Sequence, residues 1–201
     1  MPVGQYTVQD GNGRPVGTEE FRSAPGPAGW RYVSTIVTSD PEPHREVVDF
    51  VVDDGWRPVR LRIDSGQHQL VLSPAGDRLS GHRDGDPIEV PFGPEAEIDY
   101  LSPCFNAVTA RRLDRTDEIE VVYLEPVTLE PVRARQRYER GAEEDLDTPA
   151  GRFRARKWTY TSLDSGWSRS FWLAGDVVVR FQDLFELEAY EPGASGPVPG
   201  P

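Results

Sequence analysis

The sequence predicts an all-β fold, an antiparallel meander of about eleven or twelve strands. Three observations support this prediction. Clusters of Gly, Pro, Asp and Asn, which favour tight turns, recur at intervals of roughly ten residues. The segments between them alternate apolar and polar residues, as strands with one buried face do. No window of about eleven residues has the apolar spacing of an amphipathic helix.

The predicted turns divide the first half of the chain into short strands. They lie at residues 10–13, 25–27, 40–43, 53–55, 65–66, 74–77 and 84–86. Residues 59–63 and 88–92 alternate cleanly, which predicts one face on a core and the other in water. Residues 45–52 are apolar on both faces and therefore predict a strand in a central or covered position.

Residues 103–113 are the best candidate for a helix, so at most one short helix is expected. Asn106, Val108 and Thr109 give this segment a weak helix propensity. No change in composition marks a second domain, and we expect residues 1–191 to form a single one. Residues 192–201 consist mainly of Gly and Pro, which predicts a disordered tail.

Composition excludes several classes of protein. Lys and Arg total 22 against 34 Asp and Glu, a net charge of -12, which disfavours nucleic acid or an anionic membrane as a partner. A single cysteine forms no internal disulfide and no structural zinc site. No apolar run is long enough to span a bilayer. Residues 1–5 lack a basic region followed by an apolar run, so we expect no secretory signal and a cytoplasmic location.

The usual catalytic and metal-binding motifs are missing from the sequence. His44, His68 and His82 have no ligand spacing, so no metal site is predicted. No nucleophile elbow and no phosphate-binding loop is present, so we expect no cofactor. Cys104 has no His nearby in the sequence and is interpreted as a small buried residue.

One segment places polar groups on a predicted inner face. Residues 130–140 alternate strictly, with Val132, Ala134, Gln136 and Tyr138 on one side and charged residues on the other. If that side faces inward, Gln136 is a buried amide that needs a hydrogen-bonding partner. The partner is either a group of the protein itself or a ligand, and the pattern alone leaves both open.

Residues 151–161 and the aromatic side chains raise a similar question. Lys157 shares a predicted face with apolar residues, and either extends to the rim or contacts a ligand. Aromatic residues such as Trp158 and Trp172 lie in or beside predicted strands. They either form a core or line a cavity enclosed by the curved sheet.

The middle of the chain resembles a known family. Residues 97–113 are similar to the signature of the bacterial “putative glycolipid-binding” family, which has Asp-Leu, then Thr-Pro-x-Thr-Asn-Thr, then Arg-Arg-Leu. Residues 121–126, Gln136-Arg137-Tyr138 and the segments 151–153, 177–179 and 183–185 also resemble its later strands. The resemblance covers about residues 95–190 and implies a single-domain, strongly curved, half-open β-barrel with a hydrophobic ligand cavity.

The resemblance also implies site residues. The positions that match are Asp99, Asn106, Arg111, Arg112, Gln136 and Tyr138. The chain departs from the pattern at Ser102, Phe105 and Ala107, where the family has Thr, which suggests a drier site. For Arg111 two readings stay open: a structural ion pair with Asp99, or one arginine of the pair 111–112 binding an anionic headgroup.

Three functions are compatible with these expectations. The first is binding of a lipid-like or polyketide-like molecule, with Asn106, Arg111, Arg112, Gln136, Tyr138, Trp158 and Trp172 as the ligand-binding candidates. The second is a cofactor-free cyclase or isomerase of a hydrophobic metabolite, with Tyr138 or Lys157 as acid or base. The third is a structural or interaction protein whose barrel is filled by side chains.

Overall fold

The described residues form fifteen strands and one helix. The computed structural model describes residues 1–39 and 43–194. Residues 40–42 of the predicted turn at 40–43 and residues 195–201 of the predicted tail lie outside the described residues. The first eight strands are β1 (Val3–Gln9), β2 (Pro15–Gly26), β3 (Gly29–Thr38), β4 (His44–Val52), β5 (Pro58–Asp64), β6 (Gln69–Ala75), β7 (Arg78–Arg83) and β8 (Asp86–Pro91).

The second part of the chain contains the helix. Its elements are β9 (Glu97–Asp99), α1 (Pro103–Leu113), β10 (Asp117–Leu124), β11 (Pro131–Thr148), β12 (Gly151–Ser162), β13 (Ser168–Ala174), β14 (Val177–Phe181) and β15 (Phe185–Glu191). The all-β prediction and the single short helix at residues 103–113 are confirmed.

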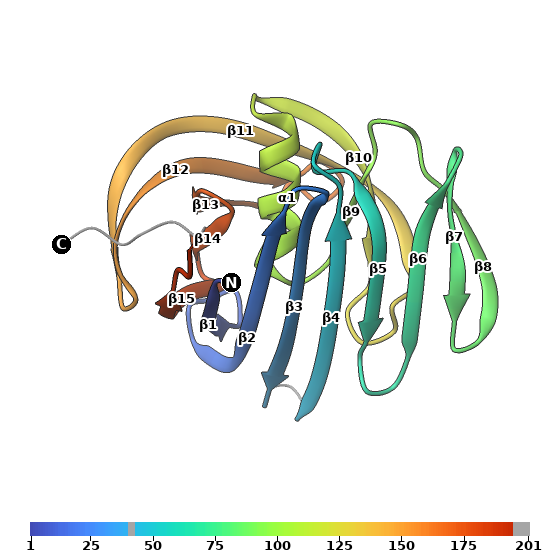
Figure 1. The fold of residues 1–201 in the computed structure, drawn as a ribbon, viewed down its shortest axis with the longest axis horizontal. Coiled ribbons are helices and arrows are strands. Elements are labelled where there is room, and N and C mark those ends of the chain that lie inside the picture. The colour runs from blue at the N-terminus through green and yellow to red at the C-terminus, as the bar shows by residue number, and fades with distance from the viewer. Residues whose placement is uncertain (40–42, 195–201) are drawn as a thin grey trace.

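All fifteen strands belong to one sheet. Consecutive strands pair with each other from β1 to β8, and again from β9 to β15, so the sheet consists of two runs of neighbouring strands. The first and last strands join the two runs, since β1 pairs with both β2 and β15 (Figure 1). The sheet ends at β8 and β9 and is not closed. The predicted half-open, barrel-like shape is therefore confirmed.

Two details differ from the prediction. The described residues contain fifteen strands rather than eleven or twelve, because several strands are short, β9 with three residues and β14 with five, and short turns separate neighbouring strands. The turns at residues 149–150 and 175–176, for example, are only two residues long. The pairing of β9 with β10 is parallel, since α1 connects them as a crossover.

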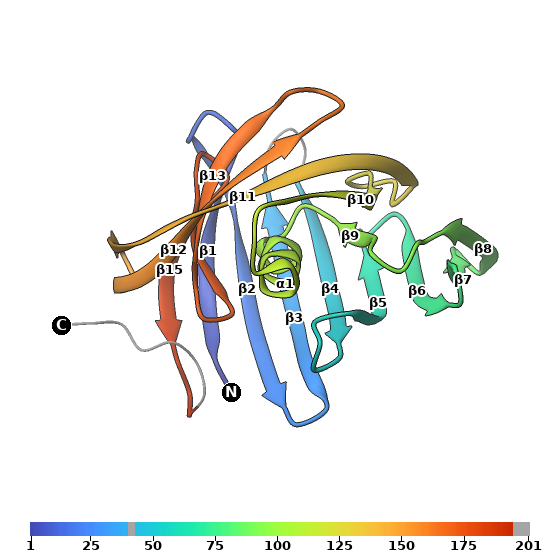
Figure 2. The same ribbon diagram turned by 90° about the horizontal axis from the view of Figure 1, so that it is seen from above.

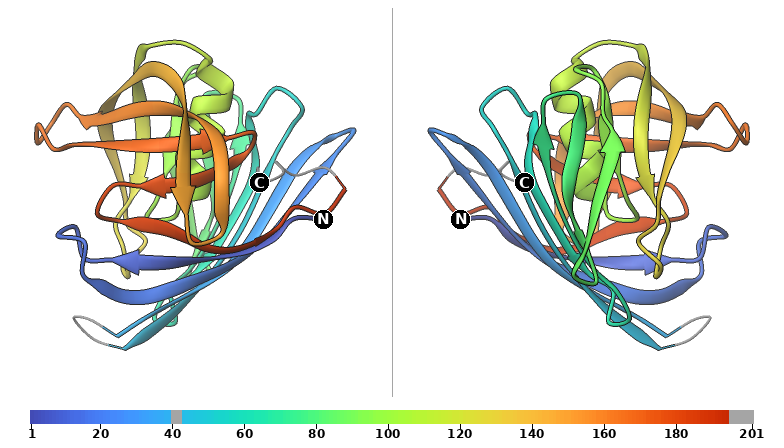
Figure 3. Two further views of the ribbon diagram at one scale, coloured as in Figure 1. Left: turned by 90° about the vertical axis from the view of Figure 1, so that its left-hand side faces the viewer. Right: turned by 90° about the vertical axis from the view of Figure 1, so that its right-hand side faces the viewer.

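The sheet curves around α1, which fills much of its interior (Figures 2 and 3). Residues 103–110 of the helix are all buried, and Phe105 stacks on Phe50 of β4 with ring centroids 4.8 Å apart. Pro103 occupies the first turn, where its missing N–H costs nothing, and Asp114 ends the helix in a left-handed conformation. Because the helix is buried on nearly all sides, its sequence shows no amphipathic period.

The alternation predicted for the strands is confirmed for most of the inner face. Leu61 and Ile63 of β5 are buried, but the prediction is wrong for Val59, which is exposed near a register shift between Val51 and Val52 in β4. In β4, Val48, Phe50 and Val52 are buried, while the residues between them are partly exposed. This strand lies between β3 and β5, so its central position is confirmed, but its second face is only partly covered. Among the described residues, no helix is long and apolar enough to cross a membrane.

Candidate functional site

A cavity of about 480 Å³ borders the N-terminal end of α1. Its volume lies in the range of sites for small organic molecules. Strand β9, the segment before the helix, the helix itself, strands β10, β11, β12, β14 and β15, and the loop between β12 and β13 contribute to its lining. Its lining includes Asp99, Ser102, Asn106, Tyr123, Val132, Arg133, Ala134, Gln136, Tyr160, Asp164, Trp167, Phe181 and Leu184.

Gln136 and Asp99 form a polar pair in the cavity wall. Gln136 is 2% exposed and Asp99 is 7% exposed, and the Gln136 Nε2 donates a hydrogen bond to Asp99 Oδ2. The Gln136 Oε1 has no hydrogen-bond partner among the described residues. Burial raises the pKa of Asp99 to about 6, although the bond from Gln136 opposes the shift. The pair therefore offers a ligand an acceptor that the protein leaves unused.

Aromatic rings form the apolar part of the cavity wall. Trp167 lies 5.7 Å from the Tyr160 ring and 6.4 Å from the Phe181 ring, measured between centroids. Charged residues stand at the rim, where Arg133 pairs with Glu120 at 3.0 Å. The cavity thus combines an apolar wall with a few polar groups, as ligand sites usually do.

Asn106 and Tyr138 support the cavity from behind. The Asn106 Nδ2 donates a 3.0 Å hydrogen bond to the Tyr138 hydroxyl, and Tyr138 is fully buried. Burial raises the pKa of Tyr138 well above its usual value. Asn106 lines the cavity, whereas Tyr138 is not among the lining residues, so its contribution is to position Asn106.

A second buried carboxylate lies next to the start of α1. Glu19 of β2 is fully buried, and its Oε1 accepts hydrogen bonds from Tyr32 at 2.8 Å and from the Ser102 hydroxyl at 2.7 Å. Burial raises the pKa of Glu19 to about 7, against the lowering effect of these bonds. Because Ser102 also lines the cavity, this carboxylate fixes one of its polar edges.

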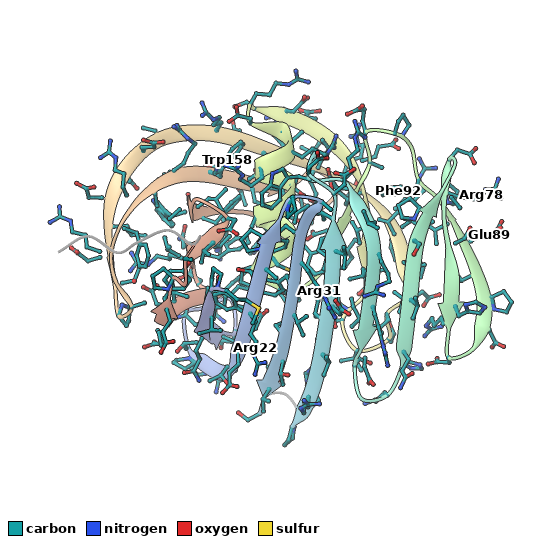
Figure 4. The ribbon with its side chains drawn as sticks, viewed as in Figure 1. Arg22, Arg31, Arg78, Glu89, Phe92 and Trp158 are labelled. Carbon is teal, nitrogen blue, oxygen red and sulfur yellow. The ribbon has the colours of Figure 1, made fainter. Side chains whose placement is uncertain are left out.

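A wider hollow of about 780 Å³ lies over β1, β2 and β3. Its lining includes Glu20, Arg22 and Arg31, which alternate with buried residues and so face away from the core. Figure 4 labels Arg22 and Arg31. Arg31 is already paired with Asp49 at 2.8 Å. This hollow presents no buried carboxylate, so the cavity at α1 is the stronger candidate. Within the described part of the chain, no group of three or more potential ligands is placed to hold a metal ion.

The family model for “Putative glycolipid-binding” proteins matches residues 12–163. This match spans most of the chain. The chain belongs to this family. The match also includes the N-terminal strands, whereas the sequence motifs resemble the family only over about residues 95–190. None of the curated proteins matches the sequence.

Two solved structures share the fold of this family member. A DUF1089 family protein from Pseudomonas aeruginosa aligns with a TM-score of 0.59 at 19% identity, covering 84% of this chain and 91% of the other. A β-barrel-like protein of domain of unknown function DUF1849 from Brucella abortus aligns with a TM-score of 0.55 at 9% identity, covering 94% and 96%. At these identities the likeness concerns the fold alone.

The structure separates the family's arginine pair from the cavity. Arg112 donates to Glu97 and Glu95, and Arg111 lies over the Trp56 ring with its guanidinium carbon 5.1 Å from the centroid. Neither arginine lines the cavity. Of the two readings left open for Arg111, the ion pair with Asp99 is wrong, because Gln136 is the partner of Asp99.

Three other predicted residues lie outside the cavity lining. Trp158 is buried at the C-terminal end of α1. Lys157 lies over the Trp172 ring, 5.4 Å from its centroid, and Trp172 donates to Glu144. The alternation expected for residues 151–161 changes face within the strand. Phe153 and Ala155 are buried in its first half, whereas Trp158 and Tyr160 are buried in its second half. The change lies opposite a register shift between Arg140 and Glu143 in β11.

The sequence does not predict several of the lining residues as site residues. Tyr123 and Phe181 look like ordinary strand residues, and nothing in the sequence separates them from the core. Leu184 lies in the turn between β14 and β15, within the segment 183–185 that resembles the family, but it carries no polar group that would indicate a site. Glu19 did carry a signal, because it shares the inner face of β2 with Phe21. An acidic residue at an inward position of a strand indicates a buried polar group.

Replacing Tyr138 by phenylalanine tests its supporting role. The change leaves the Asn106 amide without its acceptor, and we expect the free energy of unfolding to fall by about 1–2 kcal/mol. Lys157→Met serves as the control and is expected to change stability by less than about 0.5 kcal/mol. Urea denaturation measures both. An equal effect of the two variants would contradict the role assigned to Tyr138.

Proposed function

We propose that the cavity at the N-terminal end of α1 binds an amphiphilic small molecule. Its apolar part packs against Tyr160, Trp167 and Phe181, which line one wall. Its polar end carries hydrogen-bond donors, such as the hydroxyl groups of a sugar. The family to which the chain belongs agrees with this class of ligand.

The observation that carries the proposal is the unpaired Gln136 Oε1 beside Asp99. Both groups accept hydrogen bonds, and Arg111 and Arg112 contact other partners, so an anionic headgroup would find no cation in the inner wall. A hydroxyl group, in contrast, donates to either acceptor. A fatty acid is therefore a poorer ligand than a glycoside with the same tail.

Binding of two matched probes tests the proposal. An alkyl glucoside and a fatty acid of equal chain length, below their micelle concentrations, are titrated into the protein by isothermal calorimetry. We expect saturable binding of the glucoside, weakened about tenfold by Gln136→Met. Lys157→Met is the control and should bind as the unaltered protein does. No saturable binding, or a preference for the fatty acid, would overturn the proposal.

A second candidate function is favoured by Asp99. A carboxyl group with a pKa of about 6 in an apolar cavity is suited to proton transfer near neutral pH. A cofactor-free cyclase or isomerase would use Asp99 rather than Tyr138 or Lys157, which do not line the cavity. If a hydrophobic metabolite is found that the unaltered protein cyclises or isomerises, loss of that turnover in Asp99→Asn, with alkyl glucoside binding retained, would favour the enzyme.

The third alternative was a structural protein with a filled interior. Helix α1 fills part of the barrel, but the remaining cavity supports a ligand instead. A cytoplasmic location and the lack of a nucleic-acid partner stay predictions, and cell fractionation checks the first of them.

A further inference from the structure

A second cavity, of about 300 Å³, lies at the opposite end of α1. The last turn of the helix, β11, β12 and the β13–β14 turn surround it, and Trp158 stands beside the helix there (Figure 4). Its charged and donor residues are Arg111, Asp114, Arg140, Glu143, Arg156 and Trp158. None of these residues lines the cavity proposed for the amphiphile.

The indole of Trp158 provides the first indication of a ligand. Trp158 is 1% exposed, and its ring stacks on Phe171 with centroids 6.4 Å apart. Its Nε1 is buried and has no acceptor among the described residues. Buried tryptophan N–H groups normally find a partner, so a donor left unpaired in a cavity wall points to an acceptor that binds there.

The arginines provide the second indication. Three arginines and two carboxylates line the cavity, an excess of one positive charge in a chain whose net charge is -12. Arg156 contacts Glu143 at 2.6 Å and the Gly141 carbonyl at 2.9 Å, which leaves part of its guanidinium unused. Arg140 contacts Asp114 at 3.3 Å, and the Arg111 guanidinium lies over the ring of Trp56, which lines a different hollow, so Arg156 is the arginine that we assign to a ligand.

We infer that this cavity binds an oxyanion, the carboxylate or phosphate group of a small molecule. Its oxygens accept hydrogen bonds from the Trp158 indole N–H and from the Arg156 guanidinium. The first cavity offers acceptors, whereas this one offers donors, so the two ends of α1 select opposite chemistry. The inference is independent of the proposed amphiphile.

The indole resonances of the five tryptophans test it by ¹H–¹⁵N NMR. Trp158→Phe assigns the Trp158 signal. We expect sodium phosphate or sodium acetate to shift this signal saturably, and sodium chloride at equal ionic strength to leave it in place. Glycerol 3-phosphate is titrated in parallel, and tighter binding than phosphate identifies a headgroup rather than free phosphate as the source.

Matched arginine variants complete the test. Arg156→Gln is expected to weaken phosphate or acetate binding about tenfold or more, and Arg156→Lys to recover part of it. Arg137→Gln is the control, because Arg137 is an exposed residue of β11 that pairs with Glu118 outside the cavity. Well-dispersed indole signals show that each variant is folded. A Trp158 signal that does not move with either oxyanion, or moves equally in Arg156→Gln, would overturn the inference.

Discussion

Replacing Arg112 by methionine is expected to lower the free energy of unfolding by about 3–5 kcal/mol. The Arg112 Nε donates to the Oε1 of Glu97, which is 1% exposed, and the other Glu97 oxygen has no partner among the described residues. Removing the guanidinium leaves a buried carboxylate without a counter-charge. Urea denaturation at neutral pH measures the loss.

Two variants make this result specific. Arg115→Met removes an exposed ion pair with Asp117 and is expected to cost only about 0–1 kcal/mol. The double variant Glu97→Leu, Arg112→Met removes both charges and should be more stable than Arg112→Met alone, because no charge is then left unpaired. A cost of Arg112→Met below about 1 kcal/mol would contradict the prediction.

Stability is expected to fall as the pH rises from about 4.5 to about 7 through the titration of Glu19. Its pKa is about 7 in the folded chain against an ordinary value of 4.5, so the folded state binds more protons in this window. A folded state that binds more protons is destabilised when protons are removed. A difference of about 2.5 pH units corresponds to about 3 kcal/mol. Asp99, with a pKa raised from 3.8 to about 6, adds to the same trend.

Glu19→Gln isolates this contribution. The amide has no charge to bury, so we expect a flatter pH dependence and a higher free energy of unfolding than the unaltered chain at pH 8. Glu139→Gln changes an exposed carboxylate and is expected to leave the slope unchanged. Denaturation curves at several pH values between 4 and 8 give the slopes. Identical slopes for Glu19→Gln and the unaltered chain would show that Glu19 ionises without penalty.

Local sequence patterns predict the strands but not the way they are joined. Alternation placed Leu61, Ile63, Gln136 and Tyr138 on the inner face, where the structure has them. The pairing of β1 with β15 joins residues at opposite ends of the chain, and no local pattern reports it. The crossover through α1 is also invisible locally, because a helix surrounded by protein needs no polar face.

The cavity was less predictable than the strands, because its polar pairs join distant residues. Ser102 reaches Glu19, 83 residues away, and Gln136 reaches Asp99, 37 residues away. The sequence indicated that Gln136 needed a partner but not which one. Lys157 shows the opposite case, since a register shift in the neighbouring strand changes which residues of β12 are buried, and alternation cannot anticipate it.

The order of the strands across the sheet is their order along the chain, shifted circularly so that β1 and β15 are neighbours. The two free edges, β8 and β9, are consecutive in the sequence, while the two terminal strands are partners in the middle of the sheet. During synthesis, β1 can therefore pair with β15 only after the last strand has been made. The β1–β15 pairing closes the largest loop of any strand pair in the sheet. Gly193 lies against Met1, so a circular permutant that links β15 to β1 and opens the chain near Gly93 would keep every strand pair and turn the pairing with the largest loop into a hairpin.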